Sequence, residues 1–294
     1  MNIQQLQYFH AVCVYKTVSA AAEFLHISQP AVSNAVRELE KEFGVQLFHR
    51  QYRGMVLTGH GEALYARCAE LLSSFEQTKR MMSDFGDGKK LLRLGVPPMI
   101  GSQLLPKIYQ DFLPRQENMS LQITECGQNE LLSKLSDGTV DMVFLPHQSP
   151  LEKQYGSFEV TRYEIVFCAG EEHPLARCGA VTPKELENVP LVLFKDGFFQ
   201  TKLIRRWFAE GGVEPCILLQ TEQLSTMQSM IEGHRAAGFL FRKLIEKKKY
   251  LKAIPAQPPM WIRVSLVWKK EGYISDAMKA MQQYAKSLQG SQEG

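Results

Sequence analysis

The stretch HISQPAVSNAVRELEKEFG, residues 26–44, carries a proline in its first half within an otherwise helical pattern. A helix drawn through this stretch has an apolar side and a polar side, each repeating at about one helical turn. The apolar side holds Val32, Ala35, Val36 and Leu39, and the polar side holds Gln29, Ser33, Asn34 and Arg37. The pattern therefore predicts a short helix that packs on one side and offers hydrogen-bonding groups on the other.

The two ends of this helix also have signals in the sequence. Ser28 is a candidate N-cap, and Gly44 is a candidate end because glycine adopts the left-handed conformation that often closes helices. Pro30 falls in the first turn, where backbone N–H groups have no intrahelical partner, so the proline removes no helix bond. We expect Pro30 to stiffen the start of the helix.

Helical signals precede this stretch, and a hairpin pattern follows it. Leu6, Phe9 and Cys13 share one face of a first helix, and Ser19 is a candidate N-cap for a second helix, AAAEFL. After Gly44, the segment VQLFHRQYRGMVLT alternates apolar residues around a basic turn, which predicts a small β-hairpin. Two helices joined by a short turn, with such a hairpin behind them, are typical of a winged helix-turn-helix.

The polar side of the third helix suits the major groove of DNA. Glutamine can pair with adenine there and arginine can pair with guanine, which makes Gln29, Ser33 and Arg37 candidate base-reading residues. Arg50 and Arg53 in the hairpin suit phosphates or the minor groove. The alternative is a solvated helix face beside an ordinary hairpin.

The composition of residues 58 to about 85 predicts one long helix, because no proline or glycine follows Gly61 in this segment. At 1.5 Å per residue, its length is on the order of 35 to 40 Å. A heptad-like apolar seam runs along it and consists of Leu64, Cys68, Leu71, Phe75 and Met82. The seam packs either on the protein's own body or on a second chain, and we expect dimerisation.

Residues 85–90, FGDGKK, break the helical pattern and indicate a linker. Beyond them, apolar strands alternate with helical segments in two rounds, which predicts a parallel sheet with helices on its faces. Two extended segments, near 160–167 and 261–268, would cross between the two rounds. The pattern predicts a hinged, two-lobed binder whose ligand lies between the lobes at the ends of strands.

Composition limits the classes of protein that fit. The chain of 294 residues is 45% hydrophobic and 22% charged, which suits a soluble protein of two or three domains, and its net charge of +3 says little about DNA binding. The sequence has no secretory n-region and no apolar run near the roughly 18 residues that span a bilayer, so we expect a cytoplasmic protein without membrane contact. The six scattered cysteines are expected to be buried free thiols.

Other functional classes fit the sequence less well. It contains no GxSxG, HExxH, P-loop or GxGxxG motif, so we expect no enzymatic activity, no catalytic residue, no cofactor and no metal. A periplasmic solute-binding protein would have two lobes, but it would need a signal peptide and would leave residues 1–58 unexplained. A purely structural oligomer would leave the polar side of the third helix unexplained.

Several motifs in the first 60 residues carry a resemblance to a known family. They are Leu6-x-x-Phe9, Ser28-Gln29-Pro30-Ala31-Val32-Ser33, Leu39-Glu40, Gly44-Val45, Leu47-Phe48-x-Arg50 and Leu57-Thr58-x-x-Gly61. These motifs resemble the DNA-binding domain of LysR-type transcriptional regulators. The long helix and the two α/β lobes follow in the order that this family has.

The resemblance implies a sequence-specific, DNA-binding regulator of transcription that a small molecule modulates. The implied fold is multidomain, with an all-α winged helix-turn-helix domain at 1–58, a linker and dimerisation helix at 59–88, and a two-lobed α/β effector domain, similar to periplasmic binding proteins, at 89–294. Lobe 1 is expected at about 91–162 and 267–294, and lobe 2 at about 163–266. The implied partners are double-stranded DNA at a promoter or operator, a small-molecule effector, and further copies of the chain in a dimer and a homotetramer. RNA polymerase is a further candidate partner.

Two sets of site residues follow from the resemblance by position. The implied DNA-facing residues are Ser28, Gln29, Pro30, Ser33, Asn34, Arg37, Arg50 and Arg53. Many members of the family have a basic residue where this chain has Asn34. The implied effector-binding residues are Pro98, Met99, Ile100, Gln128, Asn129, Pro146, Phe194, Phe199, Gln200 and Thr201.

The implied effector cleft is more apolar than is usual in the family. We expect a small organic acid with an apolar or aromatic body, because helix N-termini offer free N–H groups and a positive dipole end to a carboxylate. The alternative is that the phenylalanines of the cleft are core residues. Peroxide-sensing members carry a cysteine pair where this chain has Phe199 and Phe208, so we do not expect that mechanism here.

Overall fold

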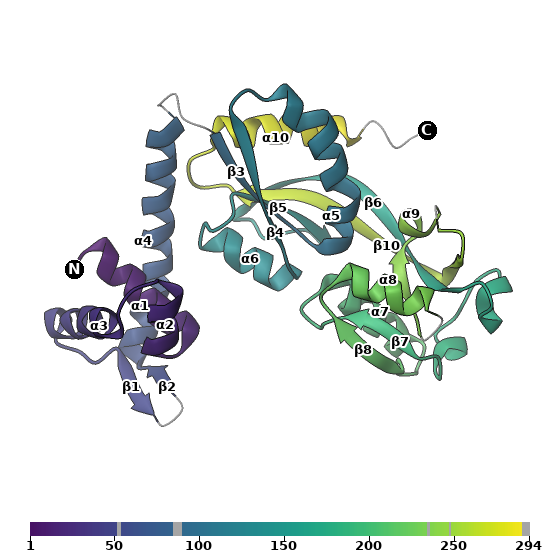
Figure 1. The fold of residues 1–294 in the computed structure, drawn as a ribbon, viewed down its shortest axis with the longest axis horizontal. Helices are drawn as coiled ribbons and strands as arrows, with labels where there is room; N and C mark the ends of the chain where they lie inside the picture. The colour runs from purple at the N-terminus through teal and green to yellow at the C-terminus, as the bar shows by residue number, and fades with distance from the viewer. Residues whose placement is uncertain (52–53, 85–89, 234–235, 247, 290–294) are drawn as a thin grey trace. The chain divides into compact units, whose positions relative to one another are not determined.

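The computed structural model describes residues 1–51, 54–84, 90–233, 236–246 and 248–289 (Figure 1). The chain divides into two compact units, of which the first holds residues 1–82 and the second holds most of the remainder. The first unit is helical with a small hairpin, and the second is built on one mixed eight-stranded sheet. The predicted fold class is confirmed.

The first unit begins with three helices and a hairpin. They are α1 (Ile3–Tyr15), α2 (Val18–Phe24), α3 (Gln29–Phe43), β1 (Phe48–Gln51) and β2 (Gly54–Leu57). Their apolar faces meet in one core, in which Phe9, Val12 and Leu39 are fully buried. The strands β1 and β2 pair antiparallel, which confirms the predicted hairpin, while its turn at 52–53 lies outside the described residues.

The helix ends agree with the sequence signals in part. The N-cap of α2 is Thr17, whose Oγ1 accepts a hydrogen bond from the N–H of Ala20 at 3.1 Å. The expected cap at Ser19 is wrong, because Ser19 lies inside α2. Ser28 is the N-cap of α3 as predicted, but its side chain makes no capping hydrogen bond to a described residue. Gly44 ends α3 with a φ of 66°, in the left-handed region.

The long helix α4 (Gly59–Asp84) has 26 residues and is therefore about 39 Å long. Its predicted apolar seam divides into two parts. Cys68 is fully buried and its Sγ donates to the Leu6 carbonyl at 3.4 Å, and Leu64 packs against the same core. The exposed members of the seam are Leu71, Phe75 and Met82. The first half of the seam thus packs on its own unit, and only the second half offers an exposed apolar edge.

The described part of the second unit has eight strands. They are β3 (Lys90–Val96), β4 (Met119–Glu125), β5 (Met142–His147), β6 (Tyr155–Gly170), β7 (Leu191–Phe194), β8 (Ile217–Thr221), β9 (Ala237–Phe241) and β10 (Leu251–Lys269). Their order in the sheet is β4-β3-β5-β10-β6-β9-β7-β8. The first three strands in sequence are parallel to one another, and so are β7, β8 and β9, which agrees with the two predicted rounds.

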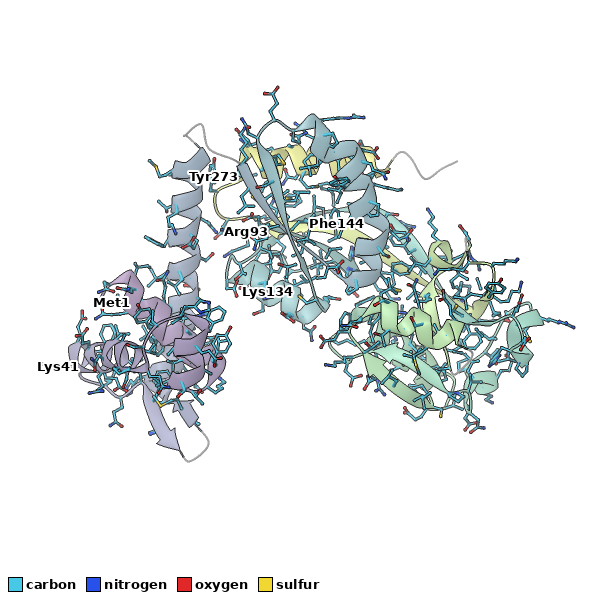
Figure 2. All side chains as sticks on the ribbon, in the orientation of Figure 1. Met1, Lys41, Arg93, Lys134, Phe144 and Tyr273 are labelled. Atoms are coloured by element: carbon cyan, nitrogen blue, oxygen red, sulfur yellow. The ribbon has the colours of Figure 1, made fainter. Side chains whose placement is uncertain are left out.

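Helices accompany each parallel half of the sheet, and each half forms one lobe (Figure 1). Lobe 1 has α5 (Pro98–Lys107), a π-helical turn (Ile108–Phe112), a 3-10 turn (Leu113–Arg115), α6 (Gln128–Ser136) and α10 (Asp276–Ser287). Lobe 2 has α7 (Phe199–Glu210), α8 (Leu224–Glu232), α9 (Arg242–Ile245) and 3-10 turns at Pro174–Arg177 and Lys184–Leu186. Phe144 of β5 is fully buried in lobe 1 (Figure 2).

The lobes are joined by β6 and β10, which pair antiparallel from Leu251–Gly170 to Lys269–Tyr155. The strand β10 begins at Leu251, about ten residues before the predicted start of the second crossing. Prolines hide this part of the strand in the sequence, because proline cannot donate a ladder hydrogen bond. A register shift between Pro255 and Met260 leaves Pro258 and Pro259 outside the regular ladder.

None of the described helices is long and apolar enough to cross a lipid bilayer.

Candidate DNA-binding surface and effector cleft

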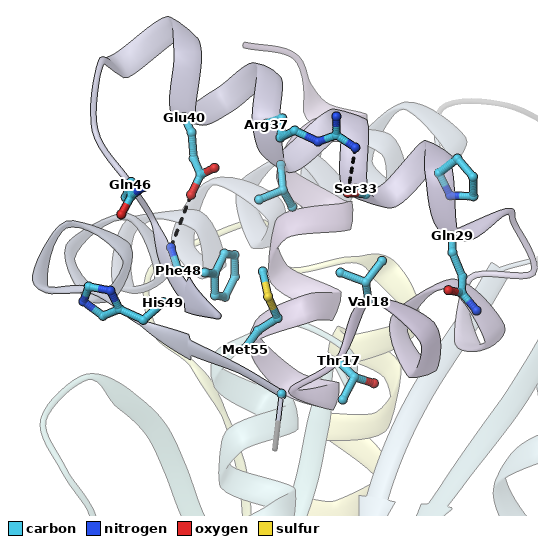
Figure 3. A pocket seen from close by; sticks show the side chains of 13 residues that line it. Thr17, Val18, Gln29, Ser33, Arg37, Glu40, Gln46, Phe48, His49 and Met55 are labelled. Atoms are coloured by element: carbon cyan, nitrogen blue, oxygen red, sulfur yellow. Dashed lines mark hydrogen bonds between the residues drawn. The ribbon is translucent and has the colours of Figure 1, made fainter. Parts of the chain in front are cut away.

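A concave surface lies between α3, the start of α2 and the hairpin, with a volume of about 970 Å³ (Figure 3). We name it the α3 surface. It is lined by Thr17, Val18, Gln29, Pro30, Ser33, Val36, Arg37, Glu40, Gln46, Phe48, His49, Gly54 and Met55. Gln29, Pro30 and Arg37 are exposed, so the polar side of α3 faces solvent along this hollow.

The two sides predicted for α3 are distinct in the structure. Val32 and Leu39 are fully buried in the core of the first unit, whereas Gln29 and Arg37 are exposed. The Arg37 Nη2 donates to the Ser33 Oγ at 3.2 Å (Figure 3). This bond orients the guanidinium along the helix, and a guanidinium has five N–H donors, so others remain for an external acceptor.

Glu40 ties the hairpin to α3. Its Oε1 accepts hydrogen bonds from the backbone N–H of Leu47 at 2.8 Å and of Phe48 at 3.4 Å, the second of which Figure 3 shows. Hydrogen bonds to an ionised acceptor are stronger than those between neutral groups. Glu40 therefore fixes where β1 starts relative to α3. The sequence pattern alone does not show this role, because the donors come from a later segment.

The other strand of the hairpin is held by the end of α1. The N–H of Met55 donates to the Lys16 carbonyl at 2.8 Å. Gly54 has a φ of 126°, and a Cβ there would lie 2.6 Å from the same carbonyl, so this position requires glycine. The backbone of Arg50 lies in β1, but its side chain and the whole of Arg53 are outside the described residues.

The structure brings half of the predicted DNA-facing set together on the α3 surface, namely Gln29, Pro30, Ser33 and Arg37. Ser28 and Asn34 are exposed on the same segment but do not line the hollow. Thr17, Gln46 and His49 line it as well and were not predicted. These three come from separate segments that only the fold brings beside α3, so no local pattern in the sequence identifies them.

A second cavity lies within the second unit, where strands of the two lobes end. We name it the interlobe cavity. It is lined by Pro97, Pro98, Met99, Ile100, Gln128, Pro146, Phe194, Phe198, Phe199, Gln200, Phe241 and Ile262. Its volume is about 20 Å³, which is space for about one water molecule. All of these lining residues are uncharged, and most are apolar, so the lining of this small cavity is largely apolar.

Three helices begin at the interlobe cavity. The first residues of α5, α6 and α7 are Pro98, Gln128 and Phe199, and each of them lines the cavity. N–H groups of a first helical turn have no intrahelical acceptor, and the dipole end there is positive. Pro98 has no N–H, so α6 and α7 offer more of these donors than α5.

The start of α7 is held by buried hydrogen bonds. The Gln200 Nε2 donates to the Phe239 carbonyl, and the Thr201 Oγ1 donates to the Phe194 carbonyl at 2.8 Å. Thr201 is fully buried and does not line the cavity. The rings of Phe194 and Phe198 stack with centroids 4.8 Å apart. These phenylalanines therefore pack on each other and line the cavity at the same time.

The two lobes touch at the rim of the interlobe cavity. The Lys202 Nζ of α7 donates to the Asn129 Oδ1 of α6 at 3.2 Å. A Cβ at Gly127 would lie 2.9 Å from the Gly197 carbonyl oxygen, so the two backbones approach this closely because residue 127 is glycine. These contacts join the two lobes beside the cavity.

Most of the predicted effector-binding set lines the interlobe cavity: Pro98, Met99, Ile100, Gln128, Pro146, Phe194, Phe199 and Gln200. Asn129 and Thr201 do not line it. Phe241 and Ile262 line it and were not predicted. Phe241 is the last residue of the apolar strand β9. Its position could have been predicted from the sequence, because ligands of such sheets bind at the ends of strands. Ile262 belongs to the crossing strand β10, and its sequence neighbours give no such signal.

All six cysteines are free thiols. Cys13, Cys68 and Cys168 are buried, and burial raises the pKa of each thiol to about 12. A thiol with such a pKa stays protonated near neutral pH and is a poor nucleophile. Cys216 is exposed, so the expectation that every cysteine is buried is wrong.

The α3 surface, the hairpin and the two-lobed sheet define a class of protein, a winged helix-turn-helix regulator with an effector-binding domain. The model of the bacterial regulatory helix-turn-helix protein, lysR family, matches residues 3–62, and that of the LysR substrate binding domain matches residues 86–289. The chain belongs to the LysR family of DNA-binding transcriptional regulators, as its motifs predicted.

Relatives and solved structures agree with this assignment. The uncharacterized HTH-type transcriptional regulator YwbI of Bacillus subtilis (strain 168) is 29% identical over 295 residues, which cover 98% of this chain and 96% of the relative. The crystal structure of full-length CbnR complexed with its target DNA has a TM-score of 0.65 at 20% identity and covers 98% of this chain and 100% of that chain. The effector binding domain of QuiR in complex with shikimate has a TM-score of 0.61 at 20% identity, covering 69% of this chain and 98% of that chain. The CbnR structure shares the fold of this chain, and the QuiR domain shares the fold of its effector-binding part.

Proposed function

We propose that this LysR-type regulator reads its operator with the α3 surface. Ser28, Gln29, Pro30, Ser33, Asn34 and Arg37 would face the major groove, and Arg50 and Arg53 would bind the DNA backbone or minor groove. The observation that carries this proposal is the exposed polar side of α3 beside a hairpin that Glu40 holds in place. We assign DNA reading to residues 1–58, the linker to 59–88 and effector binding to 89–294.

We also propose that the effector is a small organic acid with an apolar or aromatic body, bound at the interlobe cavity. The first turns of α6 and α7 supply N–H donors that suit a carboxylate, and the phenylalanine-rich lining suits an apolar body. Shikimate, the ligand of QuiR, is itself a small organic acid in the same fold. Because the closed cavity has space for about one water molecule, the lobes must separate to admit the effector and then close around it.

For assembly, we propose a dimer through the exposed half of the α4 seam and a tetramer built from two such dimers. Leu71, Phe75 and Met82 would meet a second chain, whereas Leu64 and Cys68 are already used in their own core. A change in lobe closure would then alter how two DNA-binding units are placed on a partly palindromic site. RNA polymerase is a candidate partner at the promoter, and we assign the chain no enzymatic activity or cofactor.

Thermal-shift measurements on the full chain test the effector class. Aromatic and aliphatic carboxylates should raise the melting temperature, and each carboxylate should do so more than its uncharged methyl ester, for example benzoate more than methyl benzoate. The esters serve as matched controls because they keep the apolar body and add no hydrogen-bond donor. Stabilisation by amino sugars or inorganic ions alone would show that the proposed organic-acid class is wrong.

A further inference from the structure

Gln200 forms a buried wall of the interlobe cavity, and its amide has a fixed orientation. The side chain is 6% exposed, and its Nε2 donates to the Phe239 carbonyl. Because a carbonyl oxygen can only accept, the amide nitrogen must face Phe239, and the Oε1 is directed elsewhere. That Oε1 is buried and accepts no hydrogen bond from the described part of the chain.

Gln128 places a second buried amide oxygen at the cavity, from the other lobe. It is the first residue of α6, it lines the same cavity, and its Oε1 is also buried without a donor among the described residues. Buried polar atoms in folded proteins nearly always have a hydrogen-bond partner, because an unpaired one costs stability. Two unpaired acceptors on one small, uncharged cavity indicate that its ligand brings a hydrogen-bond donor.

We propose that the effector is an acid that also carries a neutral hydrogen-bond donor, and that a hydroxy acid of small apolar skeleton fits best. This inference rests on the proposed effector site and specifies its ligand further. The carboxylate only accepts, so it suits the first-turn N–H groups of α6 and α7 but cannot pair with either glutamine oxygen. The hydroxyl of the ligand would donate to the Oε1 of Gln200 or Gln128.

The charge of the lining favours a hydroxyl over an ammonium group as this donor. The residues that line the interlobe cavity are uncharged, so a buried ammonium would lack a counter-ion there. Burying an unpaired charge costs far more than burying a hydrogen-bonded hydroxyl. A plain acid without a donor would leave both glutamine oxygens unpaired when the lobes close, and its binding should be weaker for that reason.

Matched pairs of ligands test this inference by calorimetric titration of the full chain. The pairs are 3-phenyllactate with 3-phenylpropionate, mandelate with phenylacetate, and 4-hydroxybenzoate with benzoate, and methyl 4-hydroxybenzoate with methyl benzoate forms a neutral pair. At least one hydroxylated member should bind about tenfold or more tightly than its partner, because only the hydroxylated compound satisfies the buried oxygens. Equal or tighter binding of the unhydroxylated member in every pair that binds would overturn the inference.

Variants show whether the glutamines cause the preference. In Gln200→Met, which keeps the side-chain length and removes the acceptor, the affinity ratio within a pair should fall to about one. Gln128→Met is the second variant, used also if Gln200→Met fails to fold, and it should lower the same ratio. Gln110→Met, an exposed position in the π-helical turn of lobe 1, is the matched control and should leave the ratio unchanged. A ratio that survives both cavity substitutions would contradict the assignment.

The outcomes separate this inference from the proposed function. If acids bind without any preference for the hydroxyl, the organic-acid class stands and the donor inference is wrong. If no acid binds but methyl 4-hydroxybenzoate binds better than methyl benzoate, the acid class is wrong and the donor inference stands. If no member of any pair binds, both are wrong for this cavity.

Discussion

At the residue scale, a few side chains present hydrogen-bonding groups that DNA or a ligand could pair with. Gln29 is exposed at the start of α3, and the exposed Arg37 guanidinium is oriented by Ser33 through one of its five N–H donors. The Gln200 amide, by contrast, is buried with its nitrogen bound to a carbonyl, and its oxygen accepts from no described residue. The first arrangement suits base edges in a groove, and the second suits a buried ligand that donates.

Gln29→Ala tests the base-reading role of α3. The variant should lose about 1 to 3 kcal/mol of binding free energy at the specific operator, because a side chain that hydrogen-bonds a base edge is removed. Its binding to random DNA should change little, since that binding depends on phosphate contacts. Fluorescence anisotropy with both DNAs measures the two effects.

Gln4→Ala is the matched control for this experiment. Gln4 is an exposed glutamine of α1 that donates to the Tyr8 hydroxyl at 2.8 Å and does not line the α3 surface. We expect it to leave both affinities unchanged. An equal loss on specific and random DNA for Gln29→Ala would contradict its role in reading bases.

At the scale of elements, Glu40 decides how the hairpin sits against α3. Glu40→Ala would leave the N–H groups of Leu47 and Phe48 without their acceptor, and Leu47 is 1% exposed. We expect a loss of about 1 to 3 kcal/mol of local stability, because a buried donor loses a charged partner. Hydrogen exchange of the hairpin amides should speed up in this variant. Glu23→Ala, at an exposed position of α2, should leave those amides protected, and equal protection in both variants would refute the role of Glu40.

The exposed half of α4 makes a separate prediction about assembly. Leu71 and Phe75 are 46% and 38% exposed on one edge of the helix. Substituting both with glutamate should weaken the dimer, because charges would replace the apolar contact, and light scattering should show a lower mass at equal concentration. Ala66→Glu adds a charge off the seam and should keep the mass of the wild type. An unchanged mass in the double variant would exclude this edge as the interface.

The sequence patterns predicted the helices and strands well, but they predicted fewer of the contacts between them. The amphipathic pattern of α3 and the alternation in β1 and β2 are local, so their sequence was sufficient to place them. The cap at Thr17 was missed because several hydroxyl residues near α2 could serve, and only the backbone decides between them. The early part of β10 was missed because its prolines oppose strand pairing, and a long partner strand compensates for them.

For the two sites as well, residues that share one element were predicted, and residues that come from other elements were missed. Gln29, Ser33 and Arg37 were predicted because they share one helix face, whereas Thr17 and His49 reach the same surface from other segments. Most of the residues of the interlobe cavity were predicted by position from the resemblance to the LysR family. All five residues of the α4 seam were predicted to have one role, dimerisation, whereas two of them pack in their own core. Periodicity shows which residues share a helix face, but it does not show what covers each part of that face.

At the scale of the effector-binding unit, we propose that closure of the two lobes is the property that a ligand changes. The Lys202–Asn129 hydrogen bond joins α7 to α6, and the backbones meet at Gly127 and Gly197. The continuous strands β6 and β10 connect the lobes. A ligand that binds the closed form better than the open form would shift this equilibrium by its difference in affinity.

Lys202→Met tests the contact at the rim of the cavity. Removing the bond to Asn129 should favour the open form and weaken binding of a stabilising carboxylate by about two- to fivefold, as expected for a partly exposed hydrogen bond. Titration calorimetry measures the affinity. Lys195→Met removes a lysine that pairs with Glu222 within lobe 2, and it should leave the affinity unchanged. If both substitutions weakened binding equally, the loss of positive charge would explain the effect, and the role of Lys202 in lobe closure would be contradicted.

Selection of genomic DNA fragments by the full chain tests the central claim most directly. We predict that the wild type enriches a small set of fragments that share a partly palindromic motif. The Gln29→Ala chain should still bind DNA but should lose enrichment of that motif. Enrichment of the same fragments by both chains, or of no shared motif by the wild type, would contradict the claim that α3 reads a specific operator.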